Sequence, residues 1–213
     1  MGQKINPNGF RLGTSATWES RWFAPVQKYH EFIAQDMIIR KMLMTKLRPA
    51  GVTKVEIERA VGKLKVIIFV ARPGILIGRS GAGLTELKKT LQKDLRIKDG
   101  NSLEIVPMDI KSPDLSAYLV AQGISEQIIR RIPAARAMNQ SMERVMRAGA
   151  KGVKIALAGR IGGAEIARRE WKFQGSIPLH TLRAEIDFCA YPALTKSGYV
   201  GIKVWINKGE VNI

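Results

Sequence analysis

The spacing of apolar residues predicts two modules that each combine helices and strands. In the first module, apolar side chains recur at helical spacing from residue 29 until Pro49 and Gly51 end the helix. Alternating strands follow, with a turn at Gly62, and leucines at helical spacing then indicate a second long helix. The expected order is a helix over 29–48, strands over 54–58 and 64–70, helices over 73–77 and 84–95, and a strand over 103–110. Pro107 indicates an edge or a bulge in that last strand.

A second module begins after a predicted hinge at Ser112 and Pro113. Its pattern predicts helices over 115–132 and 134–148 and then strands over 153–158, 182–188 and 200–206. Two helices ahead of a small antiparallel sheet favour an α+β fold. The first seventeen residues lack any period, so we expect a basic arm that becomes ordered only on a partner. The predicted division is an arm over 1–17 and two domains over 18–111 and 112–213.

A glycine loop between the helices over 73–77 and 84–95 carries the clearest functional signal. It reads Gly78-Arg79-Ser80-Gly81, and glycine lets the backbone approach a sugar-phosphate chain because no Cβ collides with it. The N–H groups of the following helix point to the same place. A Gly-x-x-Gly loop within helix-strand-strand-helix-helix-strand is the arrangement of a type II KH domain, so we predict that these four residues bind RNA. A second instance, from Gly159 to Gly162, follows a strand, and there a structural turn is favoured.

The net charge of the chain indicates what kind of molecule it binds. Its 213 residues include 35 Lys and Arg against 18 Asp and Glu, a formal net charge of +17. Residues 1–111 contain 20 cationic and 10 acidic residues, and the remainder contains 15 and 8, so no single tail holds the excess. A chain that is basic throughout favours a polyanion as its partner.

The helix predicted to begin at Ala134 separates basic from apolar residues. Met138, Met142 and Val145 gather on one side, which we expect to pack in the core. The other side is either an ordinary solvated face or an RNA contact, and we favour RNA because acidic residues are scarce there. The predicted RNA-binding residues here are Arg130, Arg131, Arg136, Arg144, Arg147 and Lys151. Further basic residues complete the predicted set, namely Lys4, Arg11, Arg160, Arg168 and Arg169.

Catalytic and cofactor chemistry find no support in the sequence. His30, His180 and Cys189 are scattered, without metal-ligand spacing, and the last two lie too far apart along one predicted strand to form a dyad. Residues 78–85 fall short of a phosphate-binding P-loop, because Leu84 stands where a lysine is required. A single cysteine fits a reducing compartment, and no apolar run is long enough to span a bilayer. We predict no enzymatic activity, cofactor, metal, membrane association or small-molecule substrate.

Several longer motifs are spread in order over nearly the whole chain. The most distinctive are Met1-Gly2-Gln3-Lys4, Ala71-Arg72-Pro73-Gly74, Gly149-Ala150-Lys151-Gly152, Gly162-Gly163-Ala164-Glu165-Ile166-Ala167-Arg168, Pro178-Leu179-His180-Thr181-Leu182-Arg183-Ala184 and Gly201-Ile202-Lys203-Val204-Trp205-Ile206. Together they resemble the bacterial form of small-subunit ribosomal protein three. The chain departs from that family at Asn6, where a histidine is frequent, and at Arg79-Ser80, where many relatives have two basic residues.

The resemblance implies a structural constituent of the small-subunit head that binds small-subunit ribosomal RNA through both domains and the arm. Ribosomal proteins ten and fourteen are the implied neighbours, with protein two nearby. It also implies a place on the channel through which mRNA enters, shared with ribosomal proteins four and five. In the family, a segment Arg-Arg-Ala-Met-Lys helps to open structured mRNA. Here Ala135 and Asn139 replace two of its three cations, which puts the unwinding contribution in doubt.

The resemblance further implies a ribosome-bound protein of the cytoplasm, and the sequence is also compatible with an organellar ribosome. A free-standing KH-domain regulator that binds single-stranded RNA is the alternative function. Such a regulator would keep the glycine loop, but it would need neither the basic arm nor a second basic domain.

Overall fold

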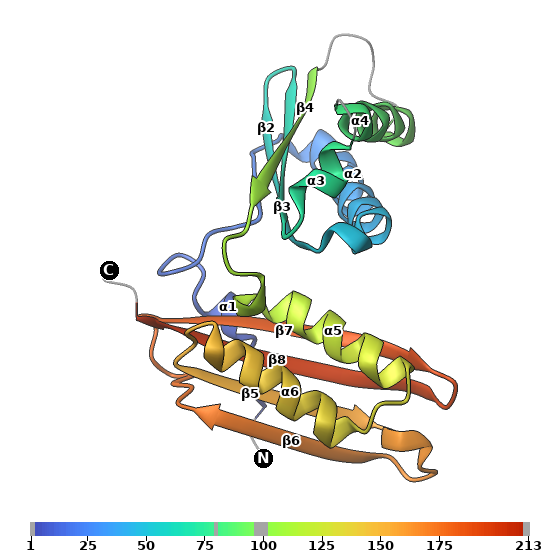
Figure 1. Ribbon diagram of the computed structural model, residues 1–213. Coiled ribbons are helices and arrows are strands. Elements are labelled where there is room, and N and C mark those ends of the chain that lie inside the picture. Colours follow the sequence, from blue (N-terminus) through green and yellow to red (C-terminus); the bar gives the residue numbers. More distant parts are fainter. Residues whose placement is uncertain (1–2, 79–80, 96–101, 211–213) are drawn as a thin grey trace. The chain divides into compact units, whose positions relative to one another are not determined.

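The computed structural model describes residues 3–78, 81–95 and 102–210, and the chain divides into two compact units. One unit comprises residues 18–111. The other comprises residues 112–213 together with residues 1–17 (Figure 1). Each unit has its own sheet of four strands and its own apolar core, so each is described by itself.

The unit over 18–111 packs its helices on one face of a sheet (Figure 1). Its elements are β1 (Ser20–Arg21), α2 (Val26–Lys46), η1 (Arg48–Ala50), β2 (Val52–Ala60), β3 (Lys63–Val70), α3 (Pro73–Ile77), α4 (Ala82–Leu95) and β4 (Ser102–Asp109). The sheet order is β1-β2-β3-β4, with β2 and β3 antiparallel and β3 and β4 parallel. The predicted α-β-β-α-α-β order is confirmed, and β1 adds a strand that the sequence did not reveal. Pro107 lies in β4 at the edge of the sheet, as predicted.

The buried carboxylate of Asp36 ties the start of this unit to its sheet. It accepts hydrogen bonds from the Ser20 hydroxyl and from the Trp22 indole N–H, both at 2.9 Å. The Arg59 guanidinium on β2 completes the group, with its closest nitrogen 2.6 Å from the carboxylate. Since both members of this ion pair are about nine-tenths buried, losing one would leave an uncompensated charge in the interior. Trp22 is thus an anchor, whereas its neighbour Phe23 is 95% exposed.

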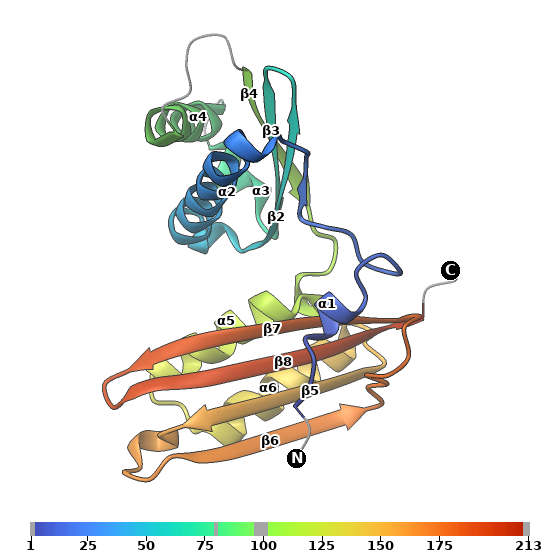
Figure 2. The same cartoon turned by 180° about the vertical axis from the view of Figure 1, so that it is seen from behind.

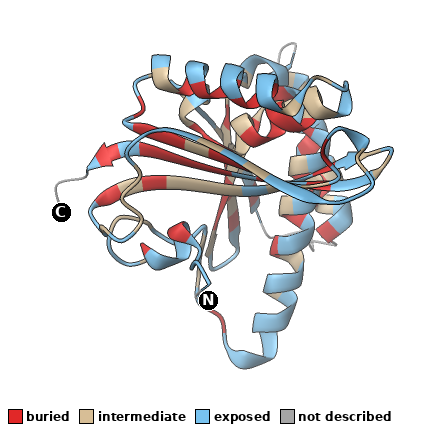
Figure 3. Ribbon diagram, turned by 90° about the horizontal axis from the view of Figure 1, so that it is seen from below, coloured by how far each residue is buried: buried red, intermediate tan, exposed pale blue. Residues whose placement is uncertain are grey.

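The second unit places helices on one face of an antiparallel sheet. Its elements are α1 (Pro7–Phe10), η3 (Pro113–Leu115), α5 (Ala117–Ile129), α6 (Ala134–Arg147), β5 (Gly152–Gly159), η4 (Ile161–Gly163), β6 (Arg168–Gly175), β7 (Ala184–Thr195) and β8 (Gly198–Glu210). The order is β6-β5-β8-β7. α5 and α6 cover one face, and α1 lies on the opposite face, as Figures 1 and 2 show. In Figure 3, helices carry their buried residues on one side only.

The predicted three-stranded sheet was incomplete, because β6 is a fourth strand. It pairs with β5 from Gly152 opposite Gly175 to Gly159 opposite Arg168, and it forms an edge of the sheet. The two helices and three strands that were predicted for this unit are all present. β7 and β8 extend further toward the C-terminus than their apolar alternation indicated.

The predicted N-terminal arm is not a separate part of the structure, because it is grouped with the second unit. Residues 1–17 belong to the second unit, where Asn6 caps α1 through hydrogen bonds from the N–H groups of Asn8 and Gly9. Arg11 is only 2% exposed, and burial lowers the pKa of its guanidinium. Its nitrogens donate to the carbonyl oxygens of Ala184 at 2.7 Å and Thr181 at 2.9 Å, with further bonds to Pro7, Pro178 and Leu179.

We therefore expect Arg11→Ala to destabilise the second unit, because it leaves several carbonyl groups without donors. A loss of about 3 kcal/mol in the free energy of unfolding is expected, since hydrogen bonds to charged groups contribute roughly 1.5–3 kcal/mol each and are not additive. Urea unfolding followed by circular dichroism measures this loss. The control is Arg183→Ala, which removes an exposed ion pair to Glu210 and should change stability by less than about 1 kcal/mol. Equal effects of the two substitutions would contradict the anchoring role.

Candidate nucleic-acid interface

The junction between α3 and α4 is built from glycines that the local geometry requires. Gly78 ends α3 with φ 68°, its N–H donating to the carbonyl of Gly74, and Gly81 has φ 79°. A Cβ on Gly83 would lie 2.6 Å from the carbonyl oxygen of Leu76, a contact that real side chains do not make. The backbone at Gly83 therefore passes close to the backbone of α3, and the positive φ angles at Gly78 and Gly81 favour glycine. Arg79 and Ser80, predicted to bind RNA, lie outside the described residues.

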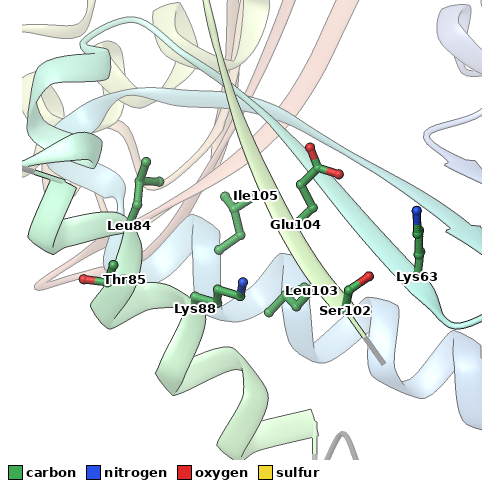
Figure 4. Close-up of a pocket in the computed structure, with 8 residues that line it drawn as sticks. All are labelled: Lys63, Leu84, Thr85, Lys88, Ser102, Leu103, Glu104 and Ile105. Carbon is green, nitrogen blue, oxygen red and sulfur yellow. The ribbon is translucent and has the colours of Figure 1, made fainter. Parts of the chain in front are cut away.

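A groove runs between α4 and β4, next to this junction in the sequence. Its volume is about 410 Å³. Leu84 of α4 and Leu103 and Ile105 of β4 supply apolar surface, and Figure 4 shows side chains from the helix and the strand facing one another. Lys63 and Lys88 add positive charge, and Glu104 adds one carboxylate. Among the described residues, β4 pairs with β3 alone, so the groove lies beside an edge strand of the sheet.

The groove has the chemistry to hold an unpaired nucleotide. Its apolar surface suits the face of a base, and its two lysines suit the phosphates on either side. None of its lining residues was among the predicted site residues, because only the pairing of β4 with β3 brings them opposite α4. The one sequence signal that pointed to this region was the glycine loop before α4.

The predicted division of α6 into an apolar and a cationic side is confirmed by burial. Met138, Met142 and Val145 are buried, while the basic residues of the opposite side are exposed, namely Arg136, Arg144 and Arg147, with Lys151 beyond the helix. Arg147 forms an exposed i,i+4 ion pair with Glu143 at 3.5 Å. Within the described ranges, no carboxylate pairs with Arg136 or Arg144.

Two further features extend this cationic side of α6. Arg130 and Arg131 are exposed at the turn before the helix, where Arg131 has φ 62°. Lys172 of β6 was not predicted as a site residue, but its ammonium donates to the side chain of Asn139 at 2.8 Å. It therefore adds a cation beside an α6 position that is itself neutral.

The other predicted basic residues fall into different environments. Arg160 donates to the carbonyls of Ala164 and Ser197, so it also stabilises the loop at η4. There, Gly162 has φ 68° and a Cβ on Gly159 would lie 2.8 Å from a backbone oxygen, which supports a structural turn. Arg168 pairs with Glu170 at 2.8 Å.

Among three further predicted residues, two are exposed and one is buried. Lys4 and Arg169 are exposed and lie in the second unit. Arg11 is not placed to contact RNA, because its guanidinium is buried and is bonded to five carbonyl groups. The prediction that Arg11 binds RNA is therefore corrected to a structural role.

The described part of the chain offers neither a metal-binding cluster nor a reactive thiol. No group of three or more His, Cys, Asp or Glu side chains there is arranged to hold a metal ion. Burial, and to a smaller extent the charge of Asp187, raises the pKa of the Cys189 thiol to about 12. Among the described residues, no helix has both the length and the apolar character needed to cross a bilayer.

Comparison with known proteins agrees with these two units. Residues 38–115 match the family model of the KH domain, and residues 124–206 match that of ribosomal protein S3, C-terminal domain. The small ribosomal subunit protein uS3 of Desulfitobacterium hafniense is 49% identical over 99% of this chain and 94% of its own length. That of Lactobacillus delbrueckii subsp. bulgaricus is also 49% identical, over 99% and 92%. The chain belongs to the uS3 family of small ribosomal subunit proteins.

Membership in the uS3 family confirms the resemblance found in the sequence. The match covers both units, as the relative from Coprothermobacter proteolyticus also illustrates, at 48% identity over 99% of this chain. It favours a structural role in the small ribosomal subunit over a free-standing KH regulator, whose similarity would be confined to the first unit. A role in the ribosome, RNA binding and the absence of enzymatic activity are properties of the family, which agrees with the prediction.

The raised pKa of Cys189 predicts a thiol that reacts slowly. Because the pKa of this thiol is raised to about 12, far less of it is thiolate at pH 8 than in the unfolded chain. The reaction with a disulfide reagent such as dithionitrobenzoate should accordingly be at least 100-fold slower in the folded protein than in urea, and it should accelerate as the pH rises. Rates within fivefold of each other would contradict the described environment of the thiol.

Proposed function

We propose that this uS3-family protein binds small-subunit ribosomal RNA through both of its folded units, as a structural part of the subunit head. The distribution of charge carries the proposal. Residues 18–111 include 18 Lys and Arg against 10 Asp and Glu, and the rest of the chain includes 17 against 8, net charges of +8 and +9. Exposed arginines without carboxylate partners on α6 support contact with phosphate groups there.

The same proposal assigns the glycine loop and the groove of the first unit to the RNA backbone and to an unpaired base. The left-handed turns at Gly78 and Gly81 support a close backbone approach. The groove between α4 and β4 supports a shape-dependent contact, in which Lys63 and Lys88 neutralise phosphates.

The family resemblance supports a more detailed placement within the ribosome. We propose ribosomal proteins ten and fourteen as direct neighbours, with protein two nearby, in a ribosome of the bacterial cytoplasm. We also propose a position on the channel through which mRNA enters, shared with ribosomal proteins four and five. Arg136, together with Lys172 beside Asn139, supports contact with mRNA at that channel. Unwinding of mRNA is left out of the proposal, because Ala135 and Asn139 lack the charge of the family's segment.

Salt dependence tests the electrostatic basis of RNA binding. If about eight phosphates are neutralised, the logarithm of the affinity for small-subunit ribosomal RNA should fall with the logarithm of salt concentration at a slope of about −6 to −7. The double substitution Arg136→Gln and Arg144→Gln removes two cations of α6, so the slope should become shallower by about 1 to 2. Arg183→Gln, which removes an arginine already paired with Glu210, is the matched control. A slope near zero would contradict the proposal.

The contact at the glycine loop can be tested with two isosteric substitutions. A Cβ at Gly81 meets no atom within 4 Å, and Asp and Asn strain its left-handed backbone to a similar extent, so the two variants differ mainly in charge. Gly81→Asp should weaken binding to ribosomal RNA about tenfold, because it places a negative charge near the phosphates. Gly81→Asn should bind like the unsubstituted protein. Binding by Gly81→Asp that equals binding by Gly81→Asn would show that the RNA backbone does not pass there.

A further inference from the structure

An exposed aromatic pair lies on the sheet of the second unit, on the face opposite α5 and α6. Trp171 and Phe173 of β6 are 55% and 60% exposed. Their rings are stacked, with centroids 5.6 Å apart and planes inclined by 21°. The alternation of the strand sets them on the opposite face from Lys172, which reaches Asn139 on α6. The pair is therefore no part of the core between sheet and helices.

Among the described residues, the N-terminal segment and a small apolar cluster cover part of this sheet face (Figure 2). Trp205, Ile186 and Ala184 are buried there in a small cluster, against which Ile177 and Leu179 pack. α1 lies over the same side and is bonded to β7 through Asn8 and the carbonyl of Phe188. Trp171 and Phe173 lie outside this cluster, on the open edge strand. Two large aromatic side chains stacked on one another at an exposed strand offer apolar ring surface to a binding partner.

Three cations surround the aromatic pair. The Lys154 ammonium lies 5.3 Å from the centroid of the Trp171 ring and 5.7 Å from that of Trp205. Arg169 precedes Trp171 by two residues and so shares its face of β6. Burial lowers the pKa of Lys154, and the nearby charges of Lys4 and Arg169 lower it further, so the three cations are close enough to repel one another.

None of these cations is balanced by a carboxylate. In the described part of the chain, Lys4, Lys154 and Arg169 take part in no ion pair. The nearest acidic neighbour in the strand, Glu170, pairs with Arg168 on the other face. An apolar protein surface would have to desolvate these three charges without compensating them, whereas a phosphate group would relieve their repulsion. The combination of stacked rings and converging cations therefore favours a nucleotide over a protein partner.

We propose that Trp171 and Phe173 form a stacking platform for an unpaired base of RNA, with Lys4, Lys154 and Arg169 holding its phosphate. The inference adds a second single-strand contact to the groove between α4 and β4, and it rests on the proposed binding of ribosomal RNA. Stacking of a base on an aromatic side chain contributes about 1–3 kcal/mol per base and tolerates any sequence. The platform thus selects single-stranded or looped segments and does not read their sequence.

Replacing the rings by an aliphatic side chain tests stacking separately from hydrophobic contact. The probe is a ten-nucleotide single-stranded RNA of mixed sequence, bound to the full chain carrying Gly81→Asp to suppress the loop of the first unit. Adding Trp171→Leu and Phe173→Leu together should weaken this binding at least tenfold. Adding Trp171→Phe and Phe173→Tyr should preserve it, because the aromatic faces remain. Tyr199→Leu removes another exposed aromatic residue of the same sheet, 69% exposed on β8, and should leave the affinity unchanged.

The outcomes separate this inference from the proposed function. A protein without these substitutions that fails to bind ribosomal RNA at low salt overturns both. If that protein binds while the double leucine variant keeps full affinity for the oligonucleotide, only the platform is overturned. A variant that binds the oligonucleotide normally but fails to assemble into small subunits identifies the surface as a protein contact, which also overturns the platform. Circular dichroism of every variant checks that the sheet remains folded.

Discussion

Repulsion among unpaired surface cations is the physical constraint on which the function of this protein depends. Both units carry a large net positive charge, and neither has enough carboxylates to balance it. Arg136 and Arg144 extend from the packed helix α6, and Lys154 and Arg169 extend from the paired strands β5 and β6. Such an arrangement opposes the compact state of the free protein, and a polyanion removes the opposition. Binding to RNA therefore supplies the missing negative charge to a scaffold that is already folded.

The structure uses its basic residues in two distinct ways. Arg59 is buried with Asp36, and Arg11 is buried among backbone carbonyls, so both serve to join distant segments of their own unit. Both are fully compensated by hydrogen bonds, as buried charges must be. Among the described residues, Arg136 and Arg144 on α6 pair with no carboxylate, so they remain available to phosphate. The count of basic residues thus overstates the cations that face RNA, and burial separates the two groups.

Sequence periodicity predicted the elements that bury one continuous apolar face. The leucines of α4 and the alternation in β8 belong to this class, because a buried face forces a regular spacing. The edge strand β6 escaped prediction for the opposite reason. Most of its residues are exposed, and both of its faces carry charged or aromatic side chains, so no apolar period marks it. An edge strand of this kind is specified by its pairing with β5, which only the folded sheet reveals.

The candidate site was predictable where the chemistry lies in local sequence. The glycine loop and the amphipathic α6 are examples, since a turn and a helix are determined over a few residues. The structural role of Arg11 could not be predicted in this way, because its carbonyl partners at Ala184 and Thr181 lie about 170 positions away in the chain. The groove beside β4 and the platform on β6 likewise depend on which strands become neighbours. Long-range pairing, and not residue type, separates the predicted from the unpredicted parts of the interface.

The central claim is that exposed cationic surfaces of both units contact RNA in the assembled small subunit. Ultraviolet cross-linking of such subunits, followed by mass spectrometry of the peptides, tests it most directly. The account predicts nucleotides attached to peptides from the groove at α4 and β4, from the exposed side of α6 and from β6. Cross-links that are missing from all three regions, in subunits that contain the protein at one copy each, would contradict the account.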